Sequence, residues 1–244
     1  MTRIGIIGAQ GRMGRAIAGL LEGGGEGRLS GGTARGDDPS ALARASDVLI
    51  DFSVPDALRV NLAAAIEAGV PIVVGTTGLG ASHQRSIDEA AERVAVLQAA
   101  NMSLGVTLLA HLVRAAAERL GPDWDIEIVE MHHRHKADAP SGTALLLGAA
   151  AAAGRGVDLA EASDRGRDGI TGPRQEGHIG FAALRGGSVA GDHQTIFATE
   201  GERLTLGHQA ESRAIFAQGA VKAALWLAGR DPGRYGMTDV LGLK

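Results

Sequence analysis

Short apolar runs alternate with segments of helical periodicity through the N-terminal part of the chain. The β-branched run at residues 3–7 predicts a buried parallel strand, and apolar residues three and four positions apart predict a helix over residues 12–22. The same alternation predicts further strands at residues 48–52, 71–74 and 94–98, and further helices at residues 55–68 and 81–91. This order of elements is typical of a doubly wound parallel sheet.

Small polar or glycine-rich turns follow four of the predicted strands. They occupy residues 8–14, 51–54, 75–78 and 99–103. The carboxyl ends of parallel strands share one sheet edge, and ligands bind at that edge in doubly wound folds. The four turns therefore predict a single binding rim.

The pattern changes after about residue 103. Helices are predicted over residues 104–120, 141–153 and 212–228, and a strand over residues 125–131. Residues 155–175 are charged and glycine-rich, so we expect them to be irregular. Four later segments are expected as antiparallel strands, at residues 178–184, 187–189, 195–199 and 203–208.

These elements predict an α/β fold with two domains. Residues 1–102, completed by residues 213–244, are expected to form a doubly wound, Rossmann-like dinucleotide-binding domain. Residues 103–212 are expected to form an α+β domain with a mixed or antiparallel sheet.

Composition excludes several classes of function. The 244 residues include no cysteine, which excludes disulfides, thiolate nucleophiles and cysteine-ligated metals. A net charge of -4 argues against a broad basic face for nucleic acid. No apolar run is long enough to span a membrane, and the N-terminus lacks a signal-peptide pattern. We therefore expect a cytoplasmic protein with neither nucleic acid nor membrane as a partner.

The first turn carries a glycine pattern. Gly8, Gly11 and Gly14 follow a strand and open a helix, the context in which backbone N–H groups hold a pyrophosphate. The spacing G-x-x-G-x-x-G departs from the commoner G-x-G-x-x-G, and a tight turn without a ligand is the alternative.

Residues 31–35, where a Rossmann-like fold places the end of its second strand, bear on the choice of cofactor. The acid that would bind the ribose of NAD is missing from residues 31–35. Arg12 and Arg35 could instead face a 2′-phosphate, while Asp37 or Asp38 could still serve the ribose. A solvated surface charge is the alternative for each arginine.

A second cluster of chemistry lies in residues 130–144. Three of the eight histidines, His132, His133 and His135, lie within four residues and next to Lys136. Such a cluster suits an anionic substrate and general acid catalysis. The residues that follow, Ser141-Gly142-Thr143, open a helix whose N–H groups can hold a carboxylate. A metal site, which Lys136 would oppose, and a solvated basic turn are the alternatives.

Together these segments resemble the 4-hydroxy-tetrahydrodipicolinate (dihydrodipicolinate) reductase family. The resemblance rests on residues 8–14, 75–78 and 100–103, and above all on the string E-x-H-H-x-x-K-x-D-x-P-S-G-T-A at residues 130–144. It implies reduction of a small cyclic dicarboxylate by NADPH or NADH in lysine and diaminopimelate biosynthesis. It also implies a homotetramer joined through the sheets of the domains that bind substrate.

The resemblance further implies residue roles. The residues matched to the pyrophosphate are Gly8, Ala9, Gln10, Gly11, Arg12 and Met13. Those matched to the nicotinamide side are Gly75, Thr76, Thr77, Ala99, Ala100, Asn101 and Met102. His132 and Lys136 match the catalytic pair, and His133, Gly142 and Thr143 match the site of the substrate carboxylate. No metal is expected, and Arg35 is expected to contact the cofactor.

The chain departs from the family pattern in its first domain. Ala34 stands where many members carry an acid, Met102 stands where phenylalanine is usual, and the stretch between Arg35 and Asp51 is short. These departures leave the preference between NADH and NADPH open. Two other functions stay open at this point: another two-domain nicotinamide oxidoreductase acting on amino or imino acids, and a non-catalytic NAD(P)-binding regulator.

Overall fold

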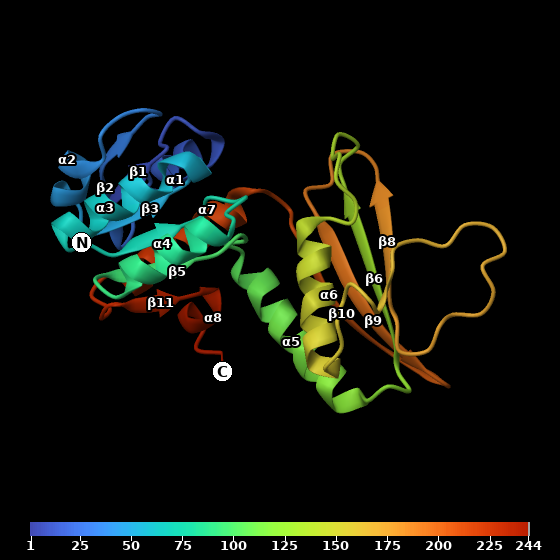
Figure 1. The fold of residues 1–244 in the computed structure, drawn as a ribbon. Helices are drawn as coiled ribbons and strands as arrows, with labels where there is room; N and C mark the ends of the chain where they lie inside the picture. Colours follow the sequence, from blue (N-terminus) through green and yellow to red (C-terminus); the bar gives the residue numbers. More distant parts are fainter. Residues whose placement is uncertain (244) are drawn as a thin grey trace. The chain divides into compact units, whose positions relative to one another are not determined.

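The computed structural model describes residues 1–243, which divide into two compact units (Figure 1). The first unit comprises Met1–Leu104 together with the segment from Ala214 onward, and the second comprises Gly105–Arg213. The chain thus begins the first unit, builds the whole of the second and returns to the first. Among the described residues, no helix is long and apolar enough to cross a membrane.

The first unit is built on a six-stranded parallel sheet in the order β11-β5-β4-β3-β1-β2. Its strands are β1 (Thr2–Ile7), β2 (Gly27–Thr33), β3 (Val48–Asp51), β4 (Ile72–Val74), β5 (Ala95–Gln98) and β11 (Gly233–Tyr235). The strand order reverses beside β1, as it does in Rossmann-like sheets. The predicted doubly wound fold is confirmed.

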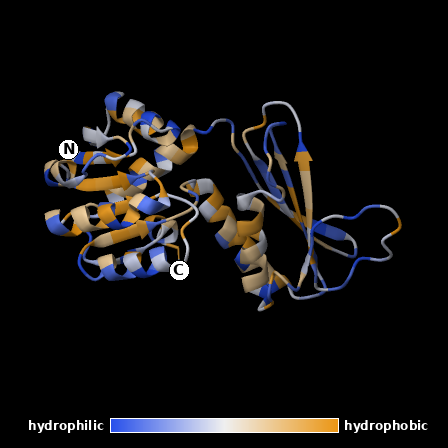
Figure 2. Cartoon of the chain, turned by 45° about the horizontal axis from the view of Figure 1, so that its top comes forward, coloured by the Kyte–Doolittle hydropathy of each residue, from blue (hydrophilic) through white to orange (hydrophobic). Residues whose placement is uncertain are grey.

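Helices cover both faces of this sheet, as alternating strand side chains require. On one face, α1 (Arg12–Glu22) and α7 (Ala214–Leu227) pack on a core that includes Ile6 and Ile50. On the other face lie α2 (Ser40–Ala45), α3 (Leu58–Ala68) and α4 (Ala81–Ala91), around Leu49 and Ile72. The short helices η1 (Pro55–Ala57) and α8 (Met237–Val240) complete the unit. Figure 2 shows the apolar residues concentrated in these strands and helices.

Small residues bring α7 close to the sheet. Ala217, Ala220, Ala223 and Ala224 are fully buried in this helix. A Cβ added to Gly219 would lie 1.8 Å from the carbonyl oxygen of Met102, so only glycine allows this approach. The closing helix therefore lies directly on the turn that follows β5.

The second unit has a five-stranded mixed sheet in the order β10-β9-β6-β8-β7. Its strands are β6 (Asp125–His132), β7 (Ser163–Asp164), β8 (Ile179–Arg185), β9 (Asp192–Thr199) and β10 (Glu202–Gln209). The helices α5 (Leu104–Leu120) and α6 (Gly142–Arg155) share one core with Ile126, Ile128 and Phe197. Strand β6 alternates strictly between buried and half-buried residues, so Glu130 and His132 lie on the same face as that core.

Three expectations for the second unit are corrected. Residues 187–189 form a turn instead of a strand, because the carbonyl groups of Gly187 and Val189 accept hydrogen bonds from the turn after β6. Strand β8 runs parallel to β6, since α6 intervenes as a crossover, and an apolar run does not encode strand direction. The stretch expected to be irregular contains the short strand β7. In the first unit, β11 and α8 were not predicted, because neither is longer than four residues.

Candidate active site

The glycine turn after β1 leaves its backbone uncovered. Gly8 has a φ of 83°, and a Cβ there would lie 2.6 Å from the carbonyl oxygen of Phe52. A Cβ at Gly14 would lie 2.4 Å from the carbonyl oxygen of Gly8, so glycine lets α1 start close to β1. Gly11 is the N-cap of α1 and supplies no side-chain acceptor to the first N–H groups. A phosphate group fits such a helix start.

The other residues matched to the pyrophosphate surround this turn. Ala9 and Met13 are half-buried, whereas Gln10 and Arg12 are exposed. Ala9 also leaves no room for a side chain at position 32 on the neighbouring strand, because a Cβ at Gly32 would lie 2.4 Å from the Cβ of Ala9. The predicted residues of this turn thus lie together at the carboxyl end of β1.

A buried carboxylate joins the turns after β3 and β4. Asp51 is fully buried, and its Oδ1 accepts hydrogen bonds from the Ser53 N–H at 2.8 Å and the Thr76 hydroxyl at 3.3 Å. Its Oδ2 accepts a hydrogen bond from Asn61 Nδ2 at 3.0 Å. Residue 51 was expected at the rim but without a role of its own. An acid that ends an apolar strand was the available signal.

The remaining residues matched to the nicotinamide side lie in the turns after β4 and β5. A Cβ at Gly75 would lie 2.4 Å from the Phe52 ring, while Thr77 is exposed. The Ala99 N–H donates to the carbonyl oxygen of Val74 at 3.1 Å, which holds the two turns together. Ala100 is exposed, Asn101 is half-buried, and Met102 is 2% exposed in the core beneath α7.

The end of β2 carries one arginine and two acids. Arg35 is exposed, and the Asp37 carboxylate accepts a hydrogen bond from the Ala34 N–H at 2.7 Å. Asp38 accepts hydrogen bonds from the hydroxyl and N–H of Ser40, which lower the pKa of Asp38. Of the two acids, Asp37 is therefore the one that turns back to the strand end beside Arg35.

In the second unit, Glu130 is a carboxylate that is only 1% exposed. Its Oε2 accepts hydrogen bonds from His132 Nδ1 at 2.6 Å and Arg185 Nη1 at 2.8 Å. Its Oε1 accepts hydrogen bonds from Arg185 Nη2 at 2.8 Å and the Ser141 N–H at 3.1 Å. Burial raises the pKa of a carboxyl group, but the hydrogen bonds from Arg185 and His132 outweigh burial and lower the pKa of Glu130. Glu130 thus joins the predicted catalytic His132 to the start of α6.

The start of α6 is fixed from a second side by His193. Ser141 is the N-cap of α6, and its hydroxyl accepts the Ala144 N–H at 3.2 Å. The same hydroxyl shares a hydrogen bond of 3.0 Å with His193 Nε2. Burial, followed by the charge of His132, lowers the pKa of His193 from 6.5 to about 4. His193 is therefore neutral at pH 7. Gly142 is exposed and Thr143 is half-buried in the first turn of the helix.

The histidine turn, which we define as residues 133–136, follows β6 and carries His133 and Lys136. The His133 N–H donates to the carbonyl oxygen of Val189 at 2.8 Å, and the Lys136 N–H donates to that of His133 at 3.1 Å. His133 Nδ1 is buried without a hydrogen-bond partner. Lys136 Nζ lies 2.9 Å from Asp138 Oδ1 and lowers the pKa of that carboxyl group.

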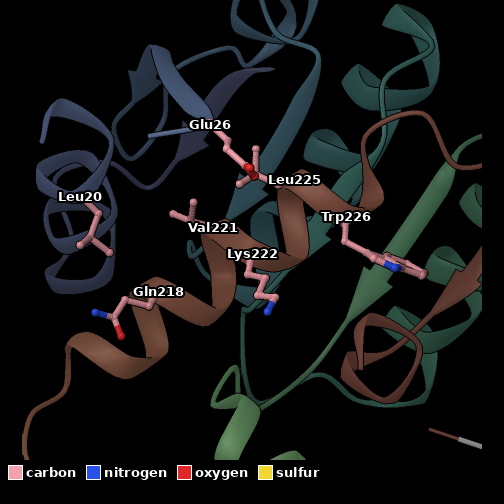
Figure 3. Close-up of a pocket in the computed structure, with 7 residues that line it drawn as sticks. All are labelled: Leu20, Glu26, Gln218, Val221, Lys222, Leu225 and Trp226. Atoms are coloured by element: carbon pink, nitrogen blue, oxygen red, sulfur yellow. The ribbon is translucent and has the colours of Figure 1, made fainter. Parts of the chain in front are cut away.

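Two other features lie outside this arrangement. Within residues 1–243, no three histidine, aspartate or glutamate side chains are placed to hold a metal ion. A cavity of about 500 Å³ lies between α1, the start of β2 and α7 (Figure 3). Its lining residues are Leu20, Glu26, Gln218, Val221, Lys222, Leu225 and Trp226, none of which is a predicted site residue.

A Rossmann-like unit with an open glycine turn, and a second unit with a cationic turn beside a helix start, define a two-domain dinucleotide-dependent oxidoreductase. Family models described as the N-terminus and the C-terminus of dihydrodipicolinate reductase match residues 2–102 and 105–241. The chain therefore belongs to the dihydrodipicolinate reductase family, whose members use NADH or NADPH in lysine and diaminopimelate biosynthesis. The predicted resemblance is confirmed.

Individual relatives agree with the family models. The 4-hydroxy-tetrahydrodipicolinate reductase of Zymomonas mobilis is 58% identical over 99% of this chain and 98% of its own length. That of Parvibaculum lavamentivorans is 54% identical over the same shares of both chains. A solved dihydrodipicolinate reductase from Paenisporosarcina sp. TG-14, with dipicolinate bound, shares the fold with a TM-score of 0.81. It is 22% identical and aligns with 98% of this chain and 99% of its own.

Proposed function

We propose that the first unit binds NADPH or NADH and that the second binds and protonates 4-hydroxy-tetrahydrodipicolinate or its dehydrated form. Gly8–Met13 would hold the pyrophosphate, Arg35 the adenosine side, and the turns after β4 and β5 the nicotinamide. When bound, the reduced nicotinamide supplies a hydride. The chain itself has to supply a proton and neutralise two carboxylates.

The observation that carries this proposal is the meeting of cations and N–H donors in the second unit. His132 and the first turn of α6 are linked through Glu130, and the histidine turn follows β6 directly. Gly142 and Thr143, with His133, would bind a substrate carboxylate. Lys136 would donate the proton, and His132 would assist as a second acid or stabilise developing negative charge.

The test is direct turnover. Purified protein is mixed with NADPH or NADH and freshly made product of dihydrodipicolinate synthase, and absorbance of the reduced nicotinamide is followed. We expect its loss to depend on both substrates. Protein that binds dinucleotide but leaves the absorbance unchanged would instead be a non-catalytic regulator.

We further propose that the protein is a cytoplasmic homotetramer joined through the second sheet. The face of this sheet opposite α6 carries Val129, Met131, Leu184 and Ile196, and Leu184 is 50% exposed. The same face carries Glu127 with Arg167 and Arg174, and partly exposed apolar side chains beside charged ones are typical of a protein–protein interface. The reaction needs the reduced dinucleotides that the cytoplasm supplies.

A further inference from the structure

The Glu130 carboxylate is surrounded by four hydrogen-bond donors on three different segments of the second unit. His132 on β6, Arg185 on β8 and Ser141 at the start of α6 provide them. We infer that Glu130 is a positioning residue that orients His132 and the carboxylate-binding start of α6 together. This inference rests on the proposed function of the second unit.

The donor pattern determines which nitrogen of His132 carries a proton. Both Glu130 oxygens accept a charge-assisted hydrogen bond from Arg185, so the carboxyl group is ionised and can only accept. His132 Nδ1 must therefore be the donor in its 2.6 Å contact with Glu130. This leaves Nε2 as the ring nitrogen available to the proposed substrate.

Gly191 leaves space beside that nitrogen. It has a φ of 154°, and a Cβ added there would lie 3.0 Å from His132 Nε2. Any larger residue would therefore crowd the nitrogen opposite the one that Glu130 holds. The space beside the imidazole depends on a glycine from the turn before β9.

The second function of Glu130 concerns the loop between β6 and α6. Its Oε1 holds the Ser141 N–H, and Arg185 Nη2 also donates to the carbonyl oxygen of Asp138 at 2.7 Å. Asp138 in turn contacts Lys136 Nζ at 2.9 Å. The Glu130–Arg185 ion pair thus orders three parts of the proposed site. It holds the start of α6, it orients His132, and it holds the backbone of Asp138, which contacts Lys136.

A glutamine at position 130 cannot satisfy the same four donors. Its amide NH₂ would face either the Arg185–His132 pair or the Arg185–Ser141 pair, and a donor would meet a donor. Glu130→Gln should lower kcat by about 10²-fold through the lost orientation of His132. It should also raise KM for the dicarboxylate by about 10-fold, while KM for the dinucleotide stays unchanged.

Glu127→Gln is the matched control. Glu127 lies on the same strand, on the opposite face, and also pairs with two arginines, Arg167 and Arg174. We expect this variant to keep both kinetic constants within about 2-fold of wild type, as a partly exposed ion pair contributes little. If Glu130→Gln behaves like the control while wild type turns over normally, the positioning role is wrong and the proposed function stands. If wild type itself shows no turnover, it is the proposed function that fails.

A measurement on the wild-type protein remains decisive even if Glu130→Gln does not fold. The ¹⁵N and ¹H shifts of His132, assigned by comparison with His132→Gln, show whether Nδ1 carries a proton. Protonated Nδ1, in the neutral ring or the imidazolium, supports the inference. A ring protonated at Nε2 alone overturns it. Binding of dipicolinate to folded Glu130→Gln, measured by calorimetry, should be weakened about 10-fold relative to Glu127→Gln, and equal affinities would argue against it.

Discussion

Lys136 is a partly buried cation that a carboxylate holds in place. Its side chain is 20% exposed, and its ammonium group is fixed 2.9 Å from Asp138. As the proposed proton donor, it should contribute to the rate and barely to dinucleotide binding. Lys136→Met should lower kcat by about 10²–10⁴-fold with an unchanged KM for NADPH, measured by steady-state kinetics.

Lys222→Met on α7 provides the control, because Lys222 is exposed in the first unit. It removes the same charge from a helix that carries no proposed catalytic residue. A Lys136→Met variant whose kcat stays within about 2-fold of this control would remove the proton-donor role from Lys136.

Arg35 and Asp37 make opposite contributions at the end of β2. Arg35 can form a forked contact with a 2′-phosphate, whereas the Asp37 carboxylate, held by the Ala34 N–H, repels it. Arg35→Ala should raise KM for NADPH about 10-fold and KM for NADH less than about 2-fold at low salt, and the difference should shrink at high ionic strength. Arg28→Ala, at the other end of β2, is the control. Equal effects on both cofactors would assign the preference to other residues.

The cluster of histidines beside a lysine is visible in the sequence, and the family resemblance proposed His132 and Lys136 from within it. The residues that hold this cluster in place were not proposed. Asp51, Glu130 and His193 acquire their partners from residues up to 55 positions away, and no local pattern encodes those contacts. Their burial was the missing information, because an ordinary carboxylate or imidazole is expected at the surface.

At the scale of elements, β9 carries a buried imidazole that makes stability depend on pH. His193 has a pKa of about 4 in the folded protein and about 6.5 when unfolded. Between these values the unfolded chain binds more protons, so stability rises with pH across this interval. The stability that the neutral His193 contributes is fully present above pH 6.5 and is lost as the pH falls toward 4. The free energy of unfolding falls by at most about 3 kcal/mol through this group.

Urea unfolding of the second unit measures this effect through Trp124, with Trp226→Phe removing the signal of the first unit. His193→Gln removes the titrating group and can still hydrogen-bond to Ser141. We expect the wild type to lose about 2–3 kcal/mol more than the variant between pH 7.5 and 4.5. Parallel stability curves for the two proteins would show that His193 is not protonated differently on unfolding.

Elements with strong periodicity were predicted well, and those defined by their neighbours were not. Helix α1 and helix α5 begin and end where their apolar spacing does. Strand β11 has three residues and exists because it pairs with β5, which lies far earlier in the chain. The parallel direction of β8 likewise follows from the crossover through α6, not from its own residues. Pairing between distant segments is the part that a local pattern cannot supply.

At the scale of the whole molecule, the partly exposed apolar residues on the face of the second sheet opposite α6 predict assembly. Leu184 on β8 is 50% exposed and belongs to the apolar set on that face. Leu184→Glu would bury a charge in the proposed interface, so it should lower the mass observed by analytical ultracentrifugation from tetramer toward smaller species. Leu146→Glu, on the exposed side of α6, is the control. A variant with the mass of wild type would place the interface elsewhere.

The return of α7 to the first unit has a consequence for synthesis of the chain. A ribosome releases the strands β1 to β5 long before it has made residues 214–227. Until then, the sheet face that receives Ala217, Ala220 and Ala224 stays bare, while the second unit, which is continuous in the chain, can fold at once. The exposed apolar surface of the nascent chain therefore lies on the part that is made first. We expect a chaperone to shield that part until synthesis of the chain ends.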